Sequence, residues 1–163
     1  MRKNLTPRIV GRHLILLSLV AITCTFATRF VVAAPTDPWT AEQTVQPAQF
    51  VEELRQEKKT HPLVIYVGAR TLYNGGHIPG AVYYGPASSE QGISELKKYA
   101  ATLPKDSDVV LYCGCCPLEK CPNLRPAFTA LKDMGLARLR VLMLPTSFNV
   151  DWVEKGFPVQ KGD

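Results

Sequence analysis

Short, mostly apolar runs rich in β-branched residues recur along the chain from residue 62 onward. Each run is four to seven residues long and is bounded by glycine, proline or charged positions. This pattern is typical of buried strands in a parallel sheet. The runs cover residues 62–68, 81–84, 108–113 and 139–144. We therefore predict a strand in each of these segments.

Between these runs the apolar positions recur at helical spacing. Phe50, Val51 and Leu54 share one face of the first such segment, while charged side chains occupy the other face. Proline is favoured at the first position of a helix, and glycine is favoured just after its end. The predicted helices begin at Pro47 and at about Ile93, run from 124 to 134 before Gly135, and cover 148–155.

Strands that alternate with helices predict an α/β domain with a mainly parallel central sheet and helices on both faces. In such folds the ligand site lies beyond the carboxyl ends of the strands. Cys113 is the last residue of the predicted strand 108–113, so it lies where this rule places the chemistry.

The first 33 residues differ in composition from the rest of the chain. They hold five basic and no acidic residues, and they include an apolar run from Leu14 to Ala27. A basic start, a short apolar stretch and small residues after it are typical of a secretory signal peptide. The run is shorter than the roughly 20 residues that span a bilayer. We predict cleavage after Ala33 and a periplasmic or secreted protein; the alternative is an uncleaved segment that anchors the protein in the membrane.

Removal of residues 1–33 changes the charge balance. The whole chain has 19 basic and 14 acidic residues, and the loss of five basic residues leaves 14 of each. A neutral mature protein gives no support for nucleic-acid binding, and we expect membrane contact only through an uncleaved leader. We interpret residues 34–46 as a linker and residues 47–163 as one domain, which we expect to be monomeric.

Four of the five cysteines lie within nine residues of one another. They are Cys113, Cys115, Cys116 and Cys121. Disulfides that stabilise an exported protein are usually spread along the chain so that they close long loops. The concentration of cysteines in one loop therefore indicates a functional site.

Six pieces of the sequence form an ordered set of motifs: Gly76–Ala81, Val109–Cys113, Arg125, Leu131–Gly135, Trp152 and Gly156–Val159. Taken in this order, they resemble the rhodanese (sulfurtransferase) family over about residues 50–159. The resemblance implies a rhodanese-like fold with a five-stranded sheet. It also implies that Cys113 forms a persulfide with sulfur from thiosulfate or a similar sulfane-sulfur donor.

The same resemblance implies the rest of the reaction and its partners. The sulfur would pass from Cys113 to a thiol, which could belong to an acceptor protein, or to a cyanide-like acceptor. Such a thiosulfate sulfurtransferase-like enzyme acts on a small sulfur-containing anion and needs no cofactor. In this family the histidine of the Gly76–Ala81 motif, here His77, mostly anchors its loop, so we expect it to be structural.

The residue types around Cys113 fit this chemistry. A thiol attacks sulfur only as thiolate, and backbone N–H groups in a loop before a helix favour negative charge. Gly114 lies in that loop, Arg125 offers a forked cation suited to an oxyanion, and Lys120 adds a second positive charge. We predict that these three residues bind the donor.

The loop after Cys113 is longer than in familiar single-domain rhodaneses, with eleven residues between Cys113 and Arg125. Its extra cysteines leave several functions open. Cys115, Cys116 or Cys121 could resolve the persulfide, or they could form a redox pair that works by thiol–disulfide exchange. The four cysteines could instead bind Cu(I), zinc or a cluster, although their spacing fits a closed zinc site poorly. They could also form a purely structural disulfide staple.

Overall fold

The computed structural model of the protein describes residues 36–57 and 60–162. The strands are β1 (Thr44–Val45), β2 (Leu63–Tyr66), β3 (Val82–Tyr83), β4 (Asp108–Tyr112) and β5 (Arg138–Leu142). The α-helices are α1 (Pro47–Arg55), α2 (Arg70–Gly75), α3 (Glu90–Ala100) and α4 (Leu124–Asp133). Two short 3₁₀ helices, η1 (Ala41–Gln43) and η2 (Leu118–Lys120), and one π-helical turn, η3 (Asn149–Val153), complete the described elements.

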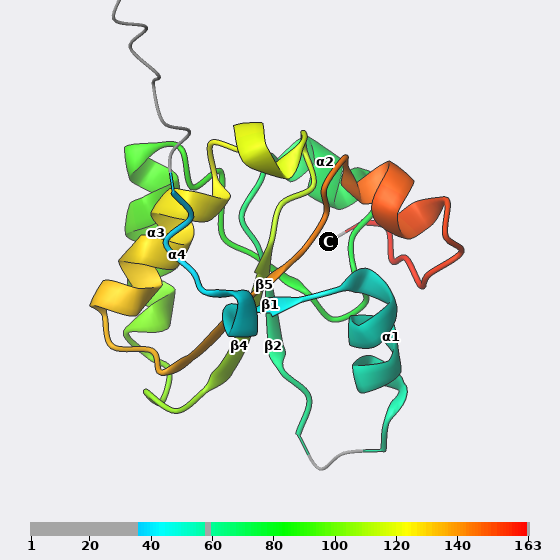
Figure 1. The fold of residues 1–163 in the computed structure, drawn as a ribbon. Helices are drawn as coiled ribbons and strands as arrows, with labels where there is room; N and C mark the ends of the chain where they lie inside the picture. Colours follow the sequence, from blue (N-terminus) through cyan, green and yellow to red (C-terminus); the bar gives the residue numbers. More distant parts are fainter. Residues whose placement is uncertain (1–35, 58–59, 163) are drawn as a thin grey trace, which may run out of the picture. The chain divides into compact units, whose positions relative to one another are not determined.

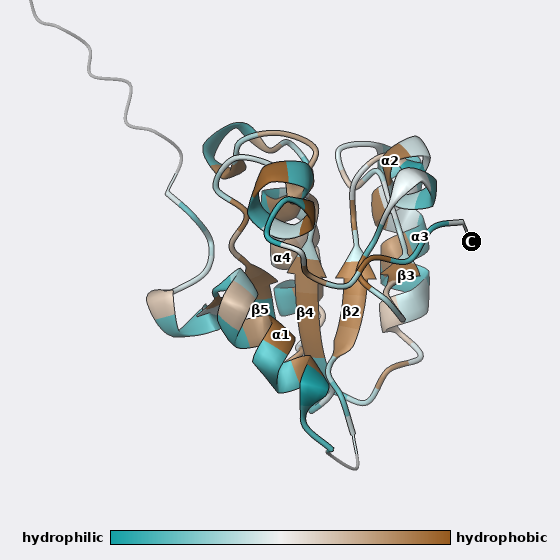
Figure 2. Ribbon diagram, turned by 90° about the vertical axis from the view of Figure 1, so that its right-hand side faces the viewer, coloured by the Kyte–Doolittle hydropathy of each residue, from teal (hydrophilic) through white to brown (hydrophobic). Residues whose placement is uncertain are grey.

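The five strands form one sheet in the order β1-β5-β4-β2-β3, and every neighbouring pair is parallel. Across the middle of the sheet, Ile65 pairs with Leu111, and Leu111 pairs with Val141. The two central strands β2 and β4 are strongly apolar, as Figure 2 shows. Strands buried on both faces need such continuous apolar runs. The predicted five-stranded parallel α/β fold is confirmed.

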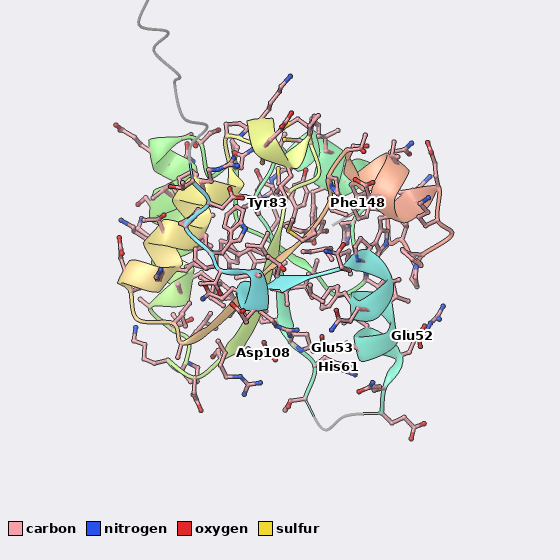
Figure 3. All side chains as sticks on the ribbon, in the orientation of Figure 1. Glu52, Glu53, His61, Tyr83, Asp108 and Phe148 are labelled. Carbon is pink, nitrogen blue, oxygen red and sulfur yellow. The ribbon has the colours of Figure 1, made fainter. Side chains whose placement is uncertain are left out.

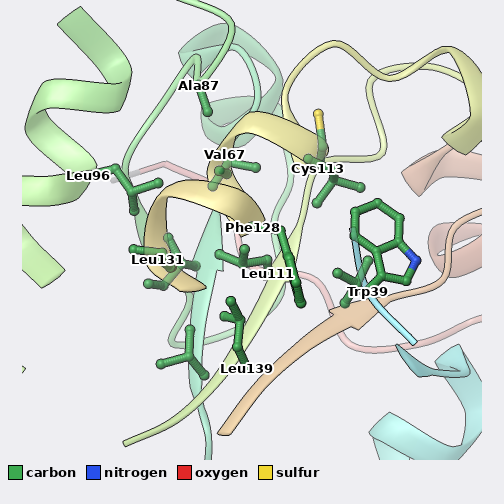
Figure 4. Packing of buried hydrophobic residues seen from close by; sticks show 14 of the residues in the cluster. Trp39, Val67, Ala87, Leu96, Leu111, Cys113, Phe128, Leu131 and Leu139 are labelled. Carbon is green, nitrogen blue, oxygen red and sulfur yellow. The ribbon is translucent and has the colours of Figure 1, made fainter. Parts of the chain in front are cut away.

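Helices cover both faces of this sheet (Figure 1). On one face, α3 and α4 contribute Leu96, Phe128 and Leu131 to a buried cluster, part of which is drawn in Figure 4. On the other face, α1 contributes Phe50 and η3 contributes Trp152 to a second cluster. Each helix thus buries its apolar side on the sheet, which accounts for the helical spacing of these positions.

Strand β4 supplies side chains to both clusters because successive residues of a strand point to opposite faces. Val109 and Leu111 belong to the cluster under α3 and α4, whereas Val110 and Tyr112 belong to the other. Cys113 continues the first series, so its side chain lies on the α3 and α4 face.

The interpretation of residues 34–46 as a linker is corrected by the structure for residues 36–46, the part of this segment that it describes. Within it, β1 pairs with β5, and Trp39 packs edge-on against Phe128 in the core, with ring centroids 5.5 Å apart. A two-residue strand is too short to show a period of two in the sequence, so the pattern could not reveal it. The folded unit therefore begins before residue 47.

Two helices also differ from the prediction. Helix α3 begins at Glu90 rather than near Ile93, because the Ser89 hydroxyl caps it by accepting the Gly92 N–H at 3.0 Å. Helix α2 was not predicted, since its six residues carry little apolar periodicity.

The two ends of the sheet differ in chemistry. Figure 3 places Asp108, Glu53 and His61 at the end opposite Phe148. At that amino end, Arg140 pairs with Glu53 at 2.9 Å and with Asp108 at 3.0 Å. These ion pairs connect α1 to β4 and β5 at the amino end of the sheet. The cysteine loop lies at the opposite, carboxyl end.

Among the residues that the structure describes, no helix is long and apolar enough to cross a membrane. The predicted signal peptide, residues 1–33, lies outside the described residues.

Candidate functional site

Cys113 follows directly after β4, at the carboxyl end of the sheet. Its side chain is 1% exposed, and in Figure 4 its sulfur points away from the aliphatic side chains of the cluster, toward the loops. The backbone of Gly68 passes close by: a Cβ at that position would lie 2.8 Å from the Cys113 sulfur. Glycine is needed there because any side chain would occupy the space of the thiol.

Three thiols converge at this point. The Cys113 and Cys115 sulfurs lie 3.2 Å apart, and the sulfur atoms of Cys113, Cys115 and Cys121 all lie within 4.8 Å of one another. All three are free thiols, as is Cys116. Cys116 is partly exposed, and its sulfur lies 3.3 Å from Cys115 but is not one of the three convergent atoms. The loop therefore gathers three of its four sulfurs at the strand end.

Asn123 connects this cluster to the rest of the domain. The residue is 4% exposed, and its amide oxygen accepts the Ser88 N–H at 2.9 Å. This contact turns the amide nitrogen toward the sulfurs of Cys113, at 3.5 Å, and Cys115, at 3.8 Å. Asn123 thus points a buried donor at two thiols.

The thiols receive opposite electrostatic environments. The hydrogen bond from Cys113 to Cys121 raises the pKa of Cys113 far above its ordinary value, and burial raises it further. The same bond lowers the pKa of Cys121 to about 5, helped by the backbone N–H groups of Asn123 and Leu124. These N–H groups begin α4, whose positive end favours an anion. Within this pair the surroundings therefore favour the thiolate of Cys121 over that of Cys113, whereas the sequence led us to expect the thiolate at Cys113.

Cys113 and Cys115 open onto a cavity of about 490 Å³. Its wall includes the carboxyl end of β2, helix α2, the segment around η3 and the C-terminal segment. Ser147, Asn149 and Lys161 add polar groups to this wall. A small anion can therefore approach the two thiols from this side.

Tyr66 also lines the cavity. Its hydroxyl is buried and has no hydrogen-bond partner among the described residues. A Cβ on Gly68 would lie 2.5 Å from this hydroxyl and 2.8 Å from the Cys113 sulfur, so the two groups are neighbours. Burial of a hydroxyl without a hydrogen-bond partner costs free energy, so a ligand that accepts a hydrogen bond from Tyr66 would be stabilised here.

Gly114 lines the cavity beside Cys113 and has a left-handed backbone with φ of +69°. Its carbonyl accepts the Phe148 N–H at 2.9 Å. A Cβ here would lie 2.6 Å from the Phe148 Cβ, so the loop can turn this closely only with glycine. The structure thus places Gly114 at the predicted site, where the left-handed backbone and the lack of space for a side chain both require glycine.

The donor-binding role predicted for Arg125 does not agree with its contacts. One guanidinium nitrogen pairs with Asp37 at 2.7 Å, and another donates to the carbonyls of Leu118, at 3.2 Å, and Cys121, at 3.4 Å. The side chain is 19% exposed and is absent from the cavity wall. Through these contacts Arg125 supports the cysteine loop, while its Nε is buried without a hydrogen-bond partner among the described residues.

Lys120 is likewise not brought to the thiols. It lies in η2, is exposed, and does not line the cavity. The cation on the cavity wall is Lys161 instead, from the C-terminal segment.

His77 is buried beneath the turn that carries it. Its Nδ1 lies 2.9 Å from the Tyr73 carbonyl, and its ring stacks on Tyr73 with centroids 3.9 Å apart. Its backbone exchanges two hydrogen bonds with Gln160, both 2.9 Å. These are the contacts of a residue that anchors the turn and the C-terminal segment.

Three site residues were missed in the sequence: Asn123, Tyr66 and Lys161. Only tertiary structure brings them together, since they come from the start of α4, the end of β2 and the C-terminal segment. Asn123 offered a weak signal, because it lies within the cysteine loop next to the expected helix start. Lys161 offered none.

Comparison with known structures supports the fold. The Alr3790 protein from Anabaena sp. superimposes with a TM-score of 0.56 and 20% identity, over 72% of this chain and 82% of that one. A thiosulfate sulfurtransferase from Pseudomonas aeruginosa superimposes with a TM-score of 0.51 and 24% identity, over 74% of this chain and 19% of that one. The anaerobic ergothioneine biosynthesis enzyme from Chlorobium limicola superimposes with a TM-score of 0.53 and 20% identity, over 73% of this chain and 28% of that one.

These similarities concern the fold. No curated protein matches the sequence closely enough to add to them. The model of the rhodanese-like domain family, however, matches residues 46–143, which include β2, β4 and the whole cysteine loop. The chain therefore belongs to the rhodanese-like domain family.

Proposed function

We propose that the protein is a sulfurtransferase that carries a sulfane sulfur as a persulfide on Cys113. The observation that supports this most directly is the position of the Cys113 thiol. This thiol is not in a disulfide and lies at the carboxyl end of the central strand. It borders a cavity, and a second thiol, that of Cys115, lies 3.2 Å away. Family membership supports the same reaction class.

With thiosulfate as donor, the reaction is a displacement at sulfur. The Cys113 sulfur, having lost its proton to Cys121 or to solvent, attacks the outer sulfur of thiosulfate. A new S–S bond forms to Cys113, the S–S bond of thiosulfate breaks, and sulfite leaves with the electron pair. The product is a Cys113 persulfide, with no net oxidation of the protein.

The cavity offers groups for both the donor and the persulfide. Lys161 supplies positive charge for an anionic donor, and Ser147 and Asn149 supply polar contacts. The Tyr66 hydroxyl, which has no other partner among the described residues, can donate to sulfur added at Cys113. The Asn123 amide nitrogen, 3.5 Å from the Cys113 sulfur, adds a second donor.

Cys115 is the best placed acceptor within the chain. Its thiolate can attack the outer sulfur and take over the persulfide, leaving Cys113 as thiolate. Attack on the Cys113 sulfur instead releases hydrosulfide and leaves a Cys113–Cys115 disulfide, which an external dithiol must reduce. Both routes use the 3.2 Å approach of the two sulfurs. A small-molecule thiol or cyanide-like acceptor would enter through the cavity.

Intact mass spectrometry tests this proposal. The reduced protein, treated with thiosulfate without acceptor, should gain about 32 Da, the mass of one sulfur atom, and release one equivalent of sulfite. Cys113→Ser should show neither change, whereas Cys116→Ser, the control, should behave like the parent protein. Persistence of the mass gain in Cys113→Ser would refute the proposal, and so would a parent protein that neither gains mass nor releases sulfite. Loss of 2 Da together with release of sulfite would indicate that Cys115 has resolved the persulfide. Loss of 2 Da without sulfite would indicate disulfide exchange instead.

We also propose that the protein acts outside the cytoplasm, after cleavage behind Ala33. This rests on the basic and apolar composition of residues 1–33. Amino-terminal sequencing of the protein from the exported fraction should start at Ala34. Recovery of the intact amino terminus in the membrane fraction would favour the anchor instead.

A further inference from the structure

The three convergent thiols form a compact group of soft ligands. Cys113 comes from the end of β4, Cys115 from the loop after it, and Cys121 from the turn before α4. Their sulfur atoms lie within 4.8 Å of one another, and none is in a disulfide. Cys113 and Cys121 are buried, while Cys115 faces the cavity. The proposed sulfur transfer uses only one or two of these thiols, so it does not explain why a third sulfur lies in the same group.

The spacing of the sulfurs fits one ion held by three ligands. A metal about 2.3 Å from each of three sulfurs in one plane holds the sulfurs about 4.0 Å apart. The observed separations, 3.2 Å for Cys113 and Cys115 and at most 4.8 Å for the others, lie on either side of this value. Small rotations of the thiols therefore suffice to surround an ion.

We propose that Cys113, Cys115 and Cys121 bind one Cu(I) ion in trigonal coordination. Thiolates are soft ligands and select Cu(I) over harder cations. Cu(I) accepts three sulfur ligands, whereas zinc in closed sites takes four in a tetrahedron. Within the described part of the chain, the convergent group contains cysteines alone, with no histidine or carboxylate. This refines the four-cysteine set considered from the sequence, because Cys116 lies outside the group.

The surroundings fit such a site. Binding releases the thiol protons to solvent, and three thiolates with one Cu(I) carry a net charge of −2. The Asn123 amide nitrogen, which faces Cys113 and Cys115, and the N–H groups at the start of α4, which face Cys121, donate to these sulfurs. Asn123 is held in place by Ser88, as an outer partner of a metal ligand usually is.

Copper and the persulfide compete for Cys113. A Cu(I) ion at this site would occupy the sulfur that the proposed transfer reaction needs, and bound copper would block that reaction. The ion itself enters from the cavity, past Cys115. The metal site depends on the arrangement of the three sulfurs, and it stands even if thiosulfate proves not to be a donor.

The test is an anaerobic titration of the fully reduced protein with Cu(I), against a colorimetric Cu(I) chelator. We expect one Cu(I) per chain, retained in the presence of excess zinc, and an X-ray absorption spectrum that fits three sulfurs at about 2.3 Å. Cys121→Ser and Cys115→Ser should each yield their copper to the chelator. Cys116→Ser, the matched control, should retain it like the parent protein.

Further variants keep the result interpretable. Asn123→Ala should weaken Cu(I) binding about 10- to 100-fold while leaving the stoichiometry at one. Because Cys115 is partly exposed, Cys115→Ser probes a ligand without opening the core. Three results would each contradict the metal site. They are equal loss of copper from Cys116→Ser, displacement of copper by zinc, and loss of copper from the parent protein to the chelator. The mass gain with thiosulfate is measured on metal-free protein, so the two proposals can fail separately.

Discussion

Cys113 and Cys121 are chemically identical side chains that differ in which backbone groups surround them. Cys113 is enclosed by the core and donates a hydrogen bond to a neighbouring sulfur, whereas Cys121 lies against the first N–H groups of α4. Two coupled thiols titrate as a pair, so removal of one changes the other. At this scale, hydrogen-bond direction decides which sulfur carries charge at neutral pH.

Titration of the reduced, metal-free protein should show this asymmetry. Since the pKa of Cys121 is lowered to about 5, one thiolate per chain should form with a midpoint near that pH and persist at all higher pH values. Thiolate absorbance in the ultraviolet measures it. Cys113→Ala removes the donor and should raise the midpoint, while Cys113→Ser keeps a hydroxyl and should raise it less. A midpoint near 8.5, the value of a free thiol, would contradict the assignment.

Lys161 should contribute to donor binding because it is the cation on the cavity wall. Lys161→Ala should raise the KM for thiosulfate about two- to fivefold with little change in kcat, since an exposed charge contributes modestly and acts mainly on binding. Lys155→Ala removes an exposed charge away from the cavity and should leave KM unchanged. Equal effects of the two substitutions would argue against a specific role for Lys161.

At the scale of elements, the segment before α1 acts on the cysteine loop. Asp37 holds Arg125, and Arg125 holds the carbonyls of Leu118 and Cys121. A residue near the start of the folded unit thereby stabilises a loop some eighty positions away. This segment is part of the site's support, although it supplies no reactive group.

Substitution of Asp37 distinguishes two roles of Arg125: stabilisation of the cysteine loop and binding of the sulfur donor. Asp37→Ala should lower the free energy of unfolding by about 1 kcal/mol, because a half-exposed ion pair contributes little. Arg125→Ala should cost about 2–3 kcal/mol, because two loop carbonyls also lose their donor. Urea denaturation measures both. Asp37→Ala should leave the KM for thiosulfate unchanged; a lower KM would mean that the released guanidinium binds the anion.

The central strands could be predicted from the sequence because β2 and most of β4 are continuous apolar runs, and because β5 leads into the apolar segment 141–144. β1 and α2 could not, since two and six residues carry too little pattern. The position of Cys113 at a strand end could be predicted, because the strand before it has a clear apolar pattern; its reactivity stays a prediction. Arg125 was assigned to the donor because its chemistry suits an oxyanion, and its partner Asp37 is too distant in sequence to be foreseen.

At the scale of the whole molecule, the core extends further toward the amino terminus than the linker interpretation allowed. Trp39 is buried against Phe128 of α4, and β1 closes the edge of the sheet beside β5. The domain that folds therefore includes both elements.

Trp39→Ala should lower the free energy of unfolding by about 3–5 kcal/mol, the usual cost of truncating a buried aromatic side chain. Glu42→Ala, at an exposed position in the same segment, should change it by less than about 0.5 kcal/mol. Thermal or urea unfolding of the exported form measures both. Similar stability of the two variants would show that residues 36–46 are a linker after all.

The cysteine loop is long, yet Leu118 and Cys121 are buried in the same cluster as Leu111 and Phe128. Its extra residues fill the interior, and Cys121 is buried among them. An oxygen atom or an alkyl group attached there has to displace packed neighbours. The melting temperature of this protein should accordingly act as a label-free gauge of oxidative damage, falling once Cys121 is modified and staying constant when only Cys116 is.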